Sequence, residues 1–238
     1  WRKMCQPCQA LLGRLLGRGG ANDFQQFLIL GLEGSGKTTL LYRLKIGKVW
    51  ETMRADLDTM KQEKDENYDP GYHYEEFAMM SKCGFWDVPG TSSLRPAWGM
   101  FYNTLQIHGV FFVINGSDTS EENIREARKH LRILLTEEAL KRSVFAIIIN
   151  VRNKKGVEDK SSKKGAADAG ELYDTKDDLL YYKLGLDTLE GENRWRVKHF
   201  ILNCNDLNGE TDRKWDPVLQ FCKSTLGDSR SFAIDFFS

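Results

Sequence analysis

A glycine-rich loop between an apolar strand and a helix constrains this chain more than any other feature. Residues 31–38 match G-x-x-x-x-G-K-[ST], after the apolar run Phe27 to Leu30 and before the helical segment Thr39 to Lys45. The glycines allow backbone N–H groups and the helix N-terminus to point at phosphate oxygens. A chance Lys-Thr pair in a glycine-rich turn is the alternative, but the flanking strand and helix favour a nucleotide site.

The side chains of this loop predict which groups hold the phosphates and a metal ion. The Lys37 ammonium reaches the β- and γ-phosphates, and the Thr38 hydroxyl is a hard oxygen ligand that suits Mg²⁺. Residues 87–90 match D-x-x-G, in which Asp87 joins the Mg²⁺ shell and the Gly90 N–H meets the γ-phosphate. The predicted phosphate-binding residues are Glu33, Gly34, Ser35, Gly36, Lys37, Thr38, Thr39 and Gly90.

Short apolar runs alternate with segments of helical periodicity along the rest of the chain. The runs predicted to be buried strands are Phe27 to Leu30, Val110 to Ile114, Val144 to Ile149 and His199 to Leu202. An amphipathic helix is predicted to begin after Thr119, and two more helices over Asp178 to Leu184 and Trp215 to Leu226 are predicted to end at Gly185 and Gly227. This alternation predicts an α/β fold with a mostly parallel central sheet flanked by helices.

The length of the chain sets the expected number of domains. The 238 residues, 41% of them hydrophobic, suffice for one sizeable core. We expect a single domain over residues 21–228, preceded by an amphipathic segment at 1–20 and followed by a tail at 229–238. Two polar, charged stretches at 53–69 and 154–170 break the pattern, and we expect both to be loop insertions.

The charge balance and the cysteine content limit the partners and the compartment. Lys plus Arg and Asp plus Glu each number 34, so no net field attracts nucleic acid, and we expect no nucleic-acid partner. No apolar run approaches the ~20 residues that a membrane span requires. The five cysteines, an odd number, fit a reducing compartment, so we expect a cytoplasmic location.

Residues around these motifs resemble the Arf family of small GTPases. The resemblance is carried by Gly31-Leu32, Gly36-Lys37-Thr38-Thr39-Leu40-Leu41, Trp86-Asp87-Val88, Leu94-Arg95-Pro96-Ala97-Trp98, Phe101-Tyr102 and Lys183-Leu184-Gly185-Leu186. It covers most of the chain from about Phe24 to about Leu226, apart from the two insertions. The resemblance implies the small-GTPase form of the P-loop fold, GTP or GDP bound with Mg²⁺, and a regulatory switch in membrane traffic. It also implies that effectors and regulators bind the switch segments, around Asp69 to Glu75 and Gly90 to Tyr102.

The residues that serve hydrolysis in the family differ in this chain. The family has Asp-Val-Gly-Gly-Gln, with a Gln that orients the attacking water, whereas Pro89 and Thr91 stand here on either side of Gly90. Thr91 is too short to span to that water as Gln does, and Pro89 fixes φ and restricts movement of the segment. Gly90 and Thr91 occupy the catalytic positions of the family. Because of these changes, we expect very slow hydrolysis of GTP.

The switch I position also differs. Asp69 falls at or near the Thr with which the family closes over Mg²⁺ and γ-phosphate, which makes it a candidate metal ligand beside Thr38 and Asp87. Its carboxylate would also repel the γ-phosphate. Thr52 or Thr59 are alternatives, because the insertion leaves the alignment open.

The segments that contact the base in the family are altered as well. The family's Asn-Lys-x-Asp corresponds to Asn150-Val151-Arg152-Asn153, and its Cys-Ala-Thr to Cys204-Asn205-Asp206. Replacing the Asp by an amide loses one acceptor, at a cost of ~1–3 kcal/mol, so guanine selectivity is expected to fall about tenfold to a hundredfold. The predicted base-binding residues are Asn150, Val151, Asn153, Cys204 and Asn205. The alternative is that Asn150 and Asn153 only cap a turn.

The first twenty residues predict an amphipathic helix. Its leucines are Leu11, Leu12, Leu15 and Leu16. The family resemblance implies that such a helix makes peripheral contact with an organelle membrane, but permanent packing on the domain fits the same leucines. Cys5 and Cys8 could carry palmitate or, as C-x-x-C, bind zinc, although no second ligand pair follows at metal-site spacing.

Three functions fit these observations. The first is the regulatory switch with slow hydrolysis, and the second is a pseudoGTPase scaffold that binds nucleotide constitutively or not at all. The third, a P-loop kinase, is disfavoured because the arginines Arg125, Arg128, Arg132 and Arg142 form no lid pattern.

Overall fold

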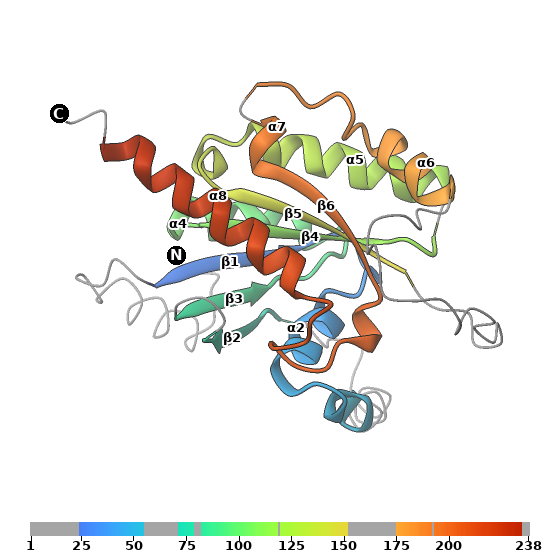
Figure 1. Ribbon diagram of the computed structural model, residues 1–238. Coiled ribbons are helices and arrows are strands. Elements are labelled where there is room, and N and C mark those ends of the chain that lie inside the picture. The colour runs from blue at the N-terminus through green and yellow to red at the C-terminus, as the bar shows by residue number, and fades with distance from the viewer. Residues whose placement is uncertain are drawn as a thin grey trace, which may run out of the picture.

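A six-stranded sheet forms the centre of the structure (Figure 1). The computed structural model describes residues 24–54, 71–78, 82–118, 120–151, 175–191 and 193–234. The strands are β1 (Gln25–Leu30), β2 (His73–Phe77), β3 (Cys83–Asp87), β4 (Gly109–Asn115), β5 (Val144–Asn150) and β6 (Val197–Leu202). Their spatial order is β2-β3-β1-β4-β5-β6, and every pair is parallel except β2 with β3. The predicted α/β fold with a mostly parallel sheet is confirmed.

The four apolar runs predicted as strands are confirmed as β1, β4, β5 and β6. β2 and β3 were not predicted from the sequence. β2 has the sequence HYEEF and lies at the sheet edge, where four of its five residues remain partly or fully exposed and no apolar run is needed. β3 is fully buried, yet it is only five residues long and contains Gly84, which weakens a strand pattern.

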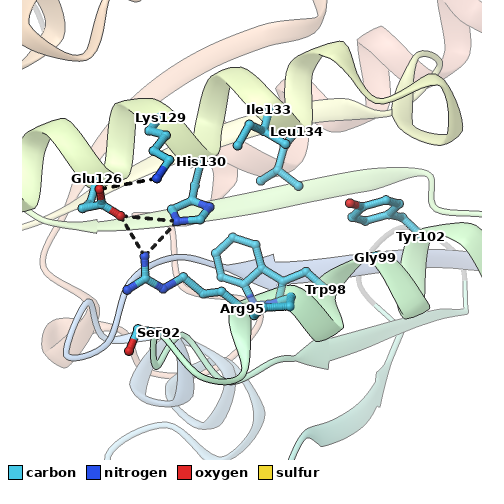
Figure 2. Close-up of a pocket in the computed structure, with 11 residues that line it drawn as sticks. Ser92, Arg95, Trp98, Gly99, Tyr102, Glu126, Lys129, His130, Ile133 and Leu134 are labelled. Atoms are coloured by element: carbon cyan, nitrogen blue, oxygen red, sulfur yellow. Dashed lines mark hydrogen bonds and ion pairs between the residues drawn. The ribbon is translucent and has the colours of Figure 1, made fainter.

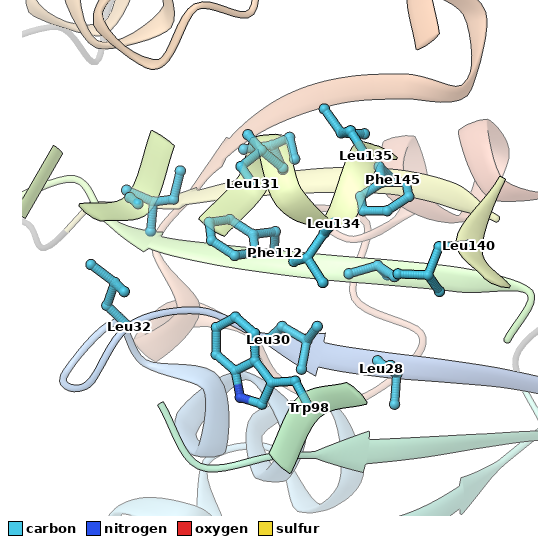
Figure 3. Close-up of a cluster of buried hydrophobic side chains, with 14 of the residues drawn as sticks. Leu28, Leu30, Leu32, Trp98, Phe112, Leu131, Leu134, Leu135, Leu140 and Phe145 are labelled. Carbon is cyan, nitrogen blue, oxygen red and sulfur yellow. The ribbon is translucent and has the colours of Figure 1, made fainter. Parts of the chain in front are cut away.

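Helices cover both faces of the sheet. They are α2 (Lys37–Ile46), α4 (Trp98–Thr104), α5 (Glu121–Thr136), α6 (Thr175–Leu184), α7 (Asn193–Arg196) and α8 (Asp216–Ile234), with short 3-10 helices η1 (Arg95–Ala97), η2 (Glu138–Leu140) and η3 (Cys204–Asp206). Helices α2 and α8 pack on one face, with Phe27 and Ile29 of β1. Helices α4, α5 and α6 pack on the other, with Leu28 and Leu30 (Figure 3). The alternation along β1 is what divides the core into two layers.

The ends of two elements differ from the predictions. Helix α6 ends at Leu184 before Gly185, as predicted, but α8 continues through Gly227 to Ile234 and includes residues 229–234 of the predicted tail. Gly227 is not among the glycines with positive φ, and a glycine that keeps helical geometry costs only about 1 kcal/mol relative to Ala. Residues 49–54 are helical, so the start of the predicted loop at 53 is wrong.

Several predictions fall outside the described residues. They concern the N-terminal helix and its cysteines, the rest of the first insertion with Asp69, and the second insertion with Asn153. None of the helices in the described ranges has the length and apolar character of a membrane span.

Candidate nucleotide site

The predicted site residues gather at one edge of the sheet. The glycine-rich loop connects β1 to α2, Asp87 ends β3, Asn150 ends β5, and Cys204 follows β6. Because β1, β3, β5 and β6 run parallel, their carboxyl ends meet at this edge, which is where open α/β sheets bind ligands.

Lys37 is buried at the first turn of α2 and turns back over the loop. Its Nζ donates a hydrogen bond to the Leu32 carbonyl at 2.9 Å, and the residue is 7% exposed. Burial lowers the pKa of Lys37, and the neighbouring carboxylates of Asp87 and Glu33 act in the opposite direction. A buried ammonium of this kind is stabilised by an anionic ligand.

Thr38 and Asp87 form the second part of the site. The Thr38 hydroxyl donates to Asp87 Oδ2 at 2.6 Å, and Asp87 is only 3% exposed. Burial raises the pKa of Asp87, while the Thr38 hydrogen bond and the Lys37 charge favour the ionised form. Asp87 Oδ1 and the Ser35 hydroxyl are buried without a hydrogen-bond partner in the described structure. Hard oxygen atoms beside an unsatisfied carboxylate oxygen fit a Mg²⁺ ion and its waters.

Two glycines allow the backbone to approach the site closely. Gly36 has a φ of 101°, and a Cβ there would lie 2.3 Å from Asn150 Nδ2. A Cβ on Gly90 would lie 2.1 Å from the Gly31 carbonyl oxygen and 2.7 Å from Lys37 Nζ. The D-x-x-G segment therefore lies directly on the glycine-rich loop, where the sequence predicted that it would meet the phosphates.

The side-chain amide of Asn150 joins two loops. Its Nδ2 donates to the Ser35 carbonyl at 3.0 Å, and its Oδ1 accepts from the Cys204 N–H at 3.0 Å. Both ends of this buried amide thus bond to backbone of the protein. Asn150 therefore contacts the first residue of the 3-10 turn η3 and also the glycine-rich loop, which a turn cap alone would not do.

The other predicted base residues lie on neighbouring segments. Val151 directly follows β5 and is half-buried, and Asn205 lies in η3, where its N–H bonds to the Asn203 side chain at 3.1 Å. Cys204 is fully buried, which raises the pKa of its thiol to about 12. The thiol of Cys204 is therefore not available to the site, and its N–H is already bonded to Asn150 Oδ1. The Asn203 contact was missed, although an Asn two residues before its bonding partner is typical of an Asx turn.

The segment after Asp87 is held by hydrogen bonds that the sequence did not predict. The Trp98 indole N–H donates to the Pro89 carbonyl at 2.8 Å. The Thr91 carbonyl accepts from the Leu94 and Arg95 N–H groups, both at 3.0 Å. The Thr91 hydroxyl lies 3.5 Å from Ser93 Oγ. These contacts place Thr91 at the start of the turn that leads into η1.

Three aromatic rings pack beside this segment. Tyr72, Trp86 and Phe101 have ring centroids 5.4 to 5.7 Å apart. Trp86 and Trp98 are buried, whereas Tyr72 and Phe101 are only half-buried. Part of this aromatic cluster therefore faces solvent.

The fold and the loop geometry define an α/β protein of the P-loop nucleotide-binding class. The model of the ADP-ribosylation factor family matches residues 14–184, more than half of the chain. The chain belongs to the Arf family of small GTPases, as the sequence motifs predicted.

Two relatives agree with this family, and one solved structure has a similar fold. The chain is 32% identical to ADP-ribosylation factor-like protein 1 of Saccharomyces cerevisiae over 138 residues, 58% of this chain and 66% of that protein. It is 31% identical to the Caenorhabditis elegans protein of the same name over 170 residues, 71% of this chain and 75% of that protein. The fold is similar to that of the Arl6 (BBS3) small GTPase of Trypanosoma brucei, with a TM-score of 0.56 at 20% identity, over 87% of this chain and 99% of that chain.

Proposed function

We propose that this chain binds GTP or GDP together with Mg²⁺ and works as a regulatory switch. The observation that carries the proposal is the cluster of Lys37, Thr38 and Asp87, in which the charged residues Lys37 and Asp87 are buried. Burying such groups costs free energy unless an opposite charge or a hydrogen-bond partner is present. A Mg²⁺-polyphosphate supplies both, including partners for Asp87 Oδ1 and the Ser35 hydroxyl.

Each residue has a distinct role in this proposal. The Lys37 ammonium neutralises phosphate charge, and the N–H groups at the start of α2 donate to phosphate oxygens. Thr38 and Asp87 hold Mg²⁺, which neutralises further phosphate charge when bound. Gly90 has no side chain to hold the D-x-x-G segment away from the glycine-rich loop, so its N–H can lie over that loop.

Slow hydrolysis is part of the proposal. A Thr91 side chain does not extend far enough to orient a water for in-line attack, and its carbonyl is engaged by Leu94 and Arg95. Pro89 fixes φ, and the Trp98 indole holds its carbonyl. Both features support the proposal that residues 89–91 move less than the Gly-Gly-Gln segment of the family.

The partner surface is proposed to include Gly71 to Glu75 and Gly90 to Tyr102. The half-buried rings of Tyr72 and Phe101 offer apolar area of the kind that forms interface centres. A role in membrane traffic and peripheral membrane contact through residues 1–20 rest on the family and on the leucine pattern alone. Binding of the full chain, but not of a chain without residues 1–20, to sedimenting vesicles would test the membrane contact.

A scaffold without a nucleotide cycle is the second candidate. It is favoured by the changes at Pro89, Thr91 and Val151, which affect hydrolysis and base contact but leave the buried core of the site in place. The two candidates differ in nucleotide content and in the preference between GDP and GTP.

The deciding experiment measures nucleotide released from the denatured purified protein, followed by titration with GDP, GTP, ATP and xanthosine nucleotides. The switch predicts tight binding of guanine nucleotides, a large difference between GDP and GTP, and reduced discrimination against the other bases. Equal affinity for GDP and GTP would favour the scaffold.

A turnover assay tests the hydrolysis proposal. The wild type should cleave GTP very slowly, and Thr91→Gln combined with Pro89→Gly should raise the rate by about 10- to 100-fold. Family-normal cleavage by the wild type, lost on Lys37→Ala, would contradict slow hydrolysis.

A further inference from the structure

A cavity of about 430 Å³ opens between residues 92–102 and α5 (Figure 2), and no residue of the glycine-rich loop lines it. One wall comes from η1 and α4, including Arg95, Trp98 and Tyr102. The other comes from α5, including Lys129, His130 and Ile133. The cavity thus uses one of the proposed partner segments and a helix to which the sequence analysis assigned no function.

The cavity combines apolar walls with a charged end. Trp98 and Leu134 are buried in the core beneath it, whereas Ile133 is 44% exposed at its rim. At the charged end, Arg95 Nη1 lies 3.2 Å from Glu126 Oε2 and 2.8 Å from His130 Nε2 (Figure 2). Lys129 Nζ lies 3.8 Å from the other oxygen of Glu126. Glu126, the acidic lining residue, is therefore already shared among basic groups.

Arg95 retains unused hydrogen-bonding capacity. Its Nε is buried and has no hydrogen-bond partner among the described residues. An unpaired buried N–H of a guanidinium is costly. The lining holds Arg95 and Lys129 with one carboxylate, Glu126, so the charged end of the cavity is suited to one more acidic group.

The surface beside the cavity is basic as well. On α5, Arg125, Lys129 and Arg132 are all exposed and recur at i, i+4 and i+7, which places them along one side of the helix. Two acids lie nearby: Glu137 accepts a hydrogen bond from the Tyr102 hydroxyl at 3.3 Å, and the exposed Glu122 lies one turn before Glu126 on α5. The chain as a whole has no net charge, so this concentration of positive charge is local.

We propose that this cavity and the basic side of α5 bind an acidic peptide segment of a partner protein. An apolar side chain of the peptide enters between Trp98 and Ile133, one carboxylate reaches Arg95, and further acids face Lys129 and Arg132. The apolar cavity favours a peptide over a lipid surface, because a membrane presents anionic headgroups but no side chain that fills such a cavity. The inference rests on the proposed role of residues 90–102 as a partner surface.

Selection of random peptides on phage against the full-length protein tests this assignment. Recovered peptides should be rich in Asp and Glu next to an aromatic or aliphatic residue. Fluorescence anisotropy then compares the wild type with the charge-reversed double variant Lys129→Glu/Arg132→Glu and with Ile133→Asp. Each should weaken peptide binding about tenfold or more, and added salt should weaken binding to the wild type.

Lys223→Glu is the matched control, because it makes the same charge change at an exposed position of α8. It should leave the peptide affinity within about twofold, the size of effect expected of a remote surface charge. Recovery of no peptide, no acidic enrichment, or equal binding to the double variant would overturn the proposal. Binding of phosphatidylserine vesicles in place of peptides would also overturn it. Nucleotide content is measured on every variant. If a protein retains its nucleotide but the peptide result contradicts the proposal, only the peptide site fails and the proposed switch stands.

Discussion

Asn150 connects the phosphate loop to the loop after β6 through its side-chain amide. Its Nδ2 donates to the Ser35 carbonyl, and its Oδ1 accepts from the Cys204 N–H, each at 3.0 Å. The two loops lie on either side of Asn150 in the sequence: Ser35 is 115 residues before it, and Cys204 is 54 residues after it. One buried side chain therefore fixes the distance between the predicted phosphate and base contacts.

Asn150→Ala should weaken nucleotide binding about tenfold to a hundredfold. The substitution leaves a buried carbonyl and a buried N–H without their partner, at ~1–3 kcal/mol, and loosens both loops. Fluorescent GDP titration measures the dissociation constant, with Asn103→Ala on the exposed side of α4 as the control. An unchanged affinity for Asn150→Ala would show that the connection does not position the site.

Arg196→Met should lower the free energy of unfolding by about 3 kcal/mol. The guanidinium is 3% exposed and donates to the carbonyls of Leu135, Leu140 and Ser143 at 2.9 to 3.1 Å. Met fills similar volume but leaves these carbonyls without that donor. Urea denaturation measures the change, and the exposed neighbour substituted as Arg194→Met should shift it by less than about 0.5 kcal/mol. Equal effects of the two variants would contradict the role of Arg196.

The contact between Arg95 and His130 should make the protein sensitive to acid. Burial lowers the pKa of His130 below its ordinary value of 6.5, and the Arg95 charge acts in the same direction. A His with a lowered folded pKa contributes stability above about pH 6.5, and that contribution is lost as the pH falls through the folded pKa. His130→Gln should therefore lose less stability than the wild type between about pH 7 and pH 5 in urea denaturation. A larger loss of stability in His130→Gln than in the wild type would contradict the lowered pKa of His130.

The buried thiols should resist alkylation until the protein unfolds. Cys204 and Cys222 are fully buried, and burial raises the pKa of each thiol to about 12 from 9.0. Their neutral forms favour the folded state at pH values below 9.0, and this stability is lost as the pH rises toward about 12. Iodoacetamide labelling near pH 8, read by mass spectrometry, should modify both only in denaturant. Fast labelling of the folded protein at either position would contradict the burial.

Sequence motifs predicted much of the site and the fold, because local pattern determines those parts. The strand, loop and helix around Lys37 are contiguous, and the Asp87 motif follows a fixed spacing. The edge strand β2 was missed because its stability comes from pairing with β3 rather than from an apolar run. The helix through Gly227 was missed because a glycine ends a helix only when it leaves helical geometry.

Side-chain contacts between distant segments could not be predicted. The paired hydrogen bonds of Asn150, the Trp98 bond to Pro89 and the Arg95 contact with His130 join residues that no local periodicity relates. Arg196 follows an unremarkable polar stretch, and only the tertiary fold brings three carbonyls to its guanidinium.

Calorimetric titration of Mg²⁺-GDP and Mg²⁺-GTP tests the central claim most directly. The nucleotide-free wild type should bind tightly, and Lys37→Ala should weaken binding about tenfold to a hundredfold, because a charge-assisted contact to phosphate is lost. Lys48→Ala, at an exposed position after α2, should bind like the wild type. No measurable affinity for either nucleotide, or equal affinity for wild type and Lys37→Ala, would contradict the proposed nucleotide site.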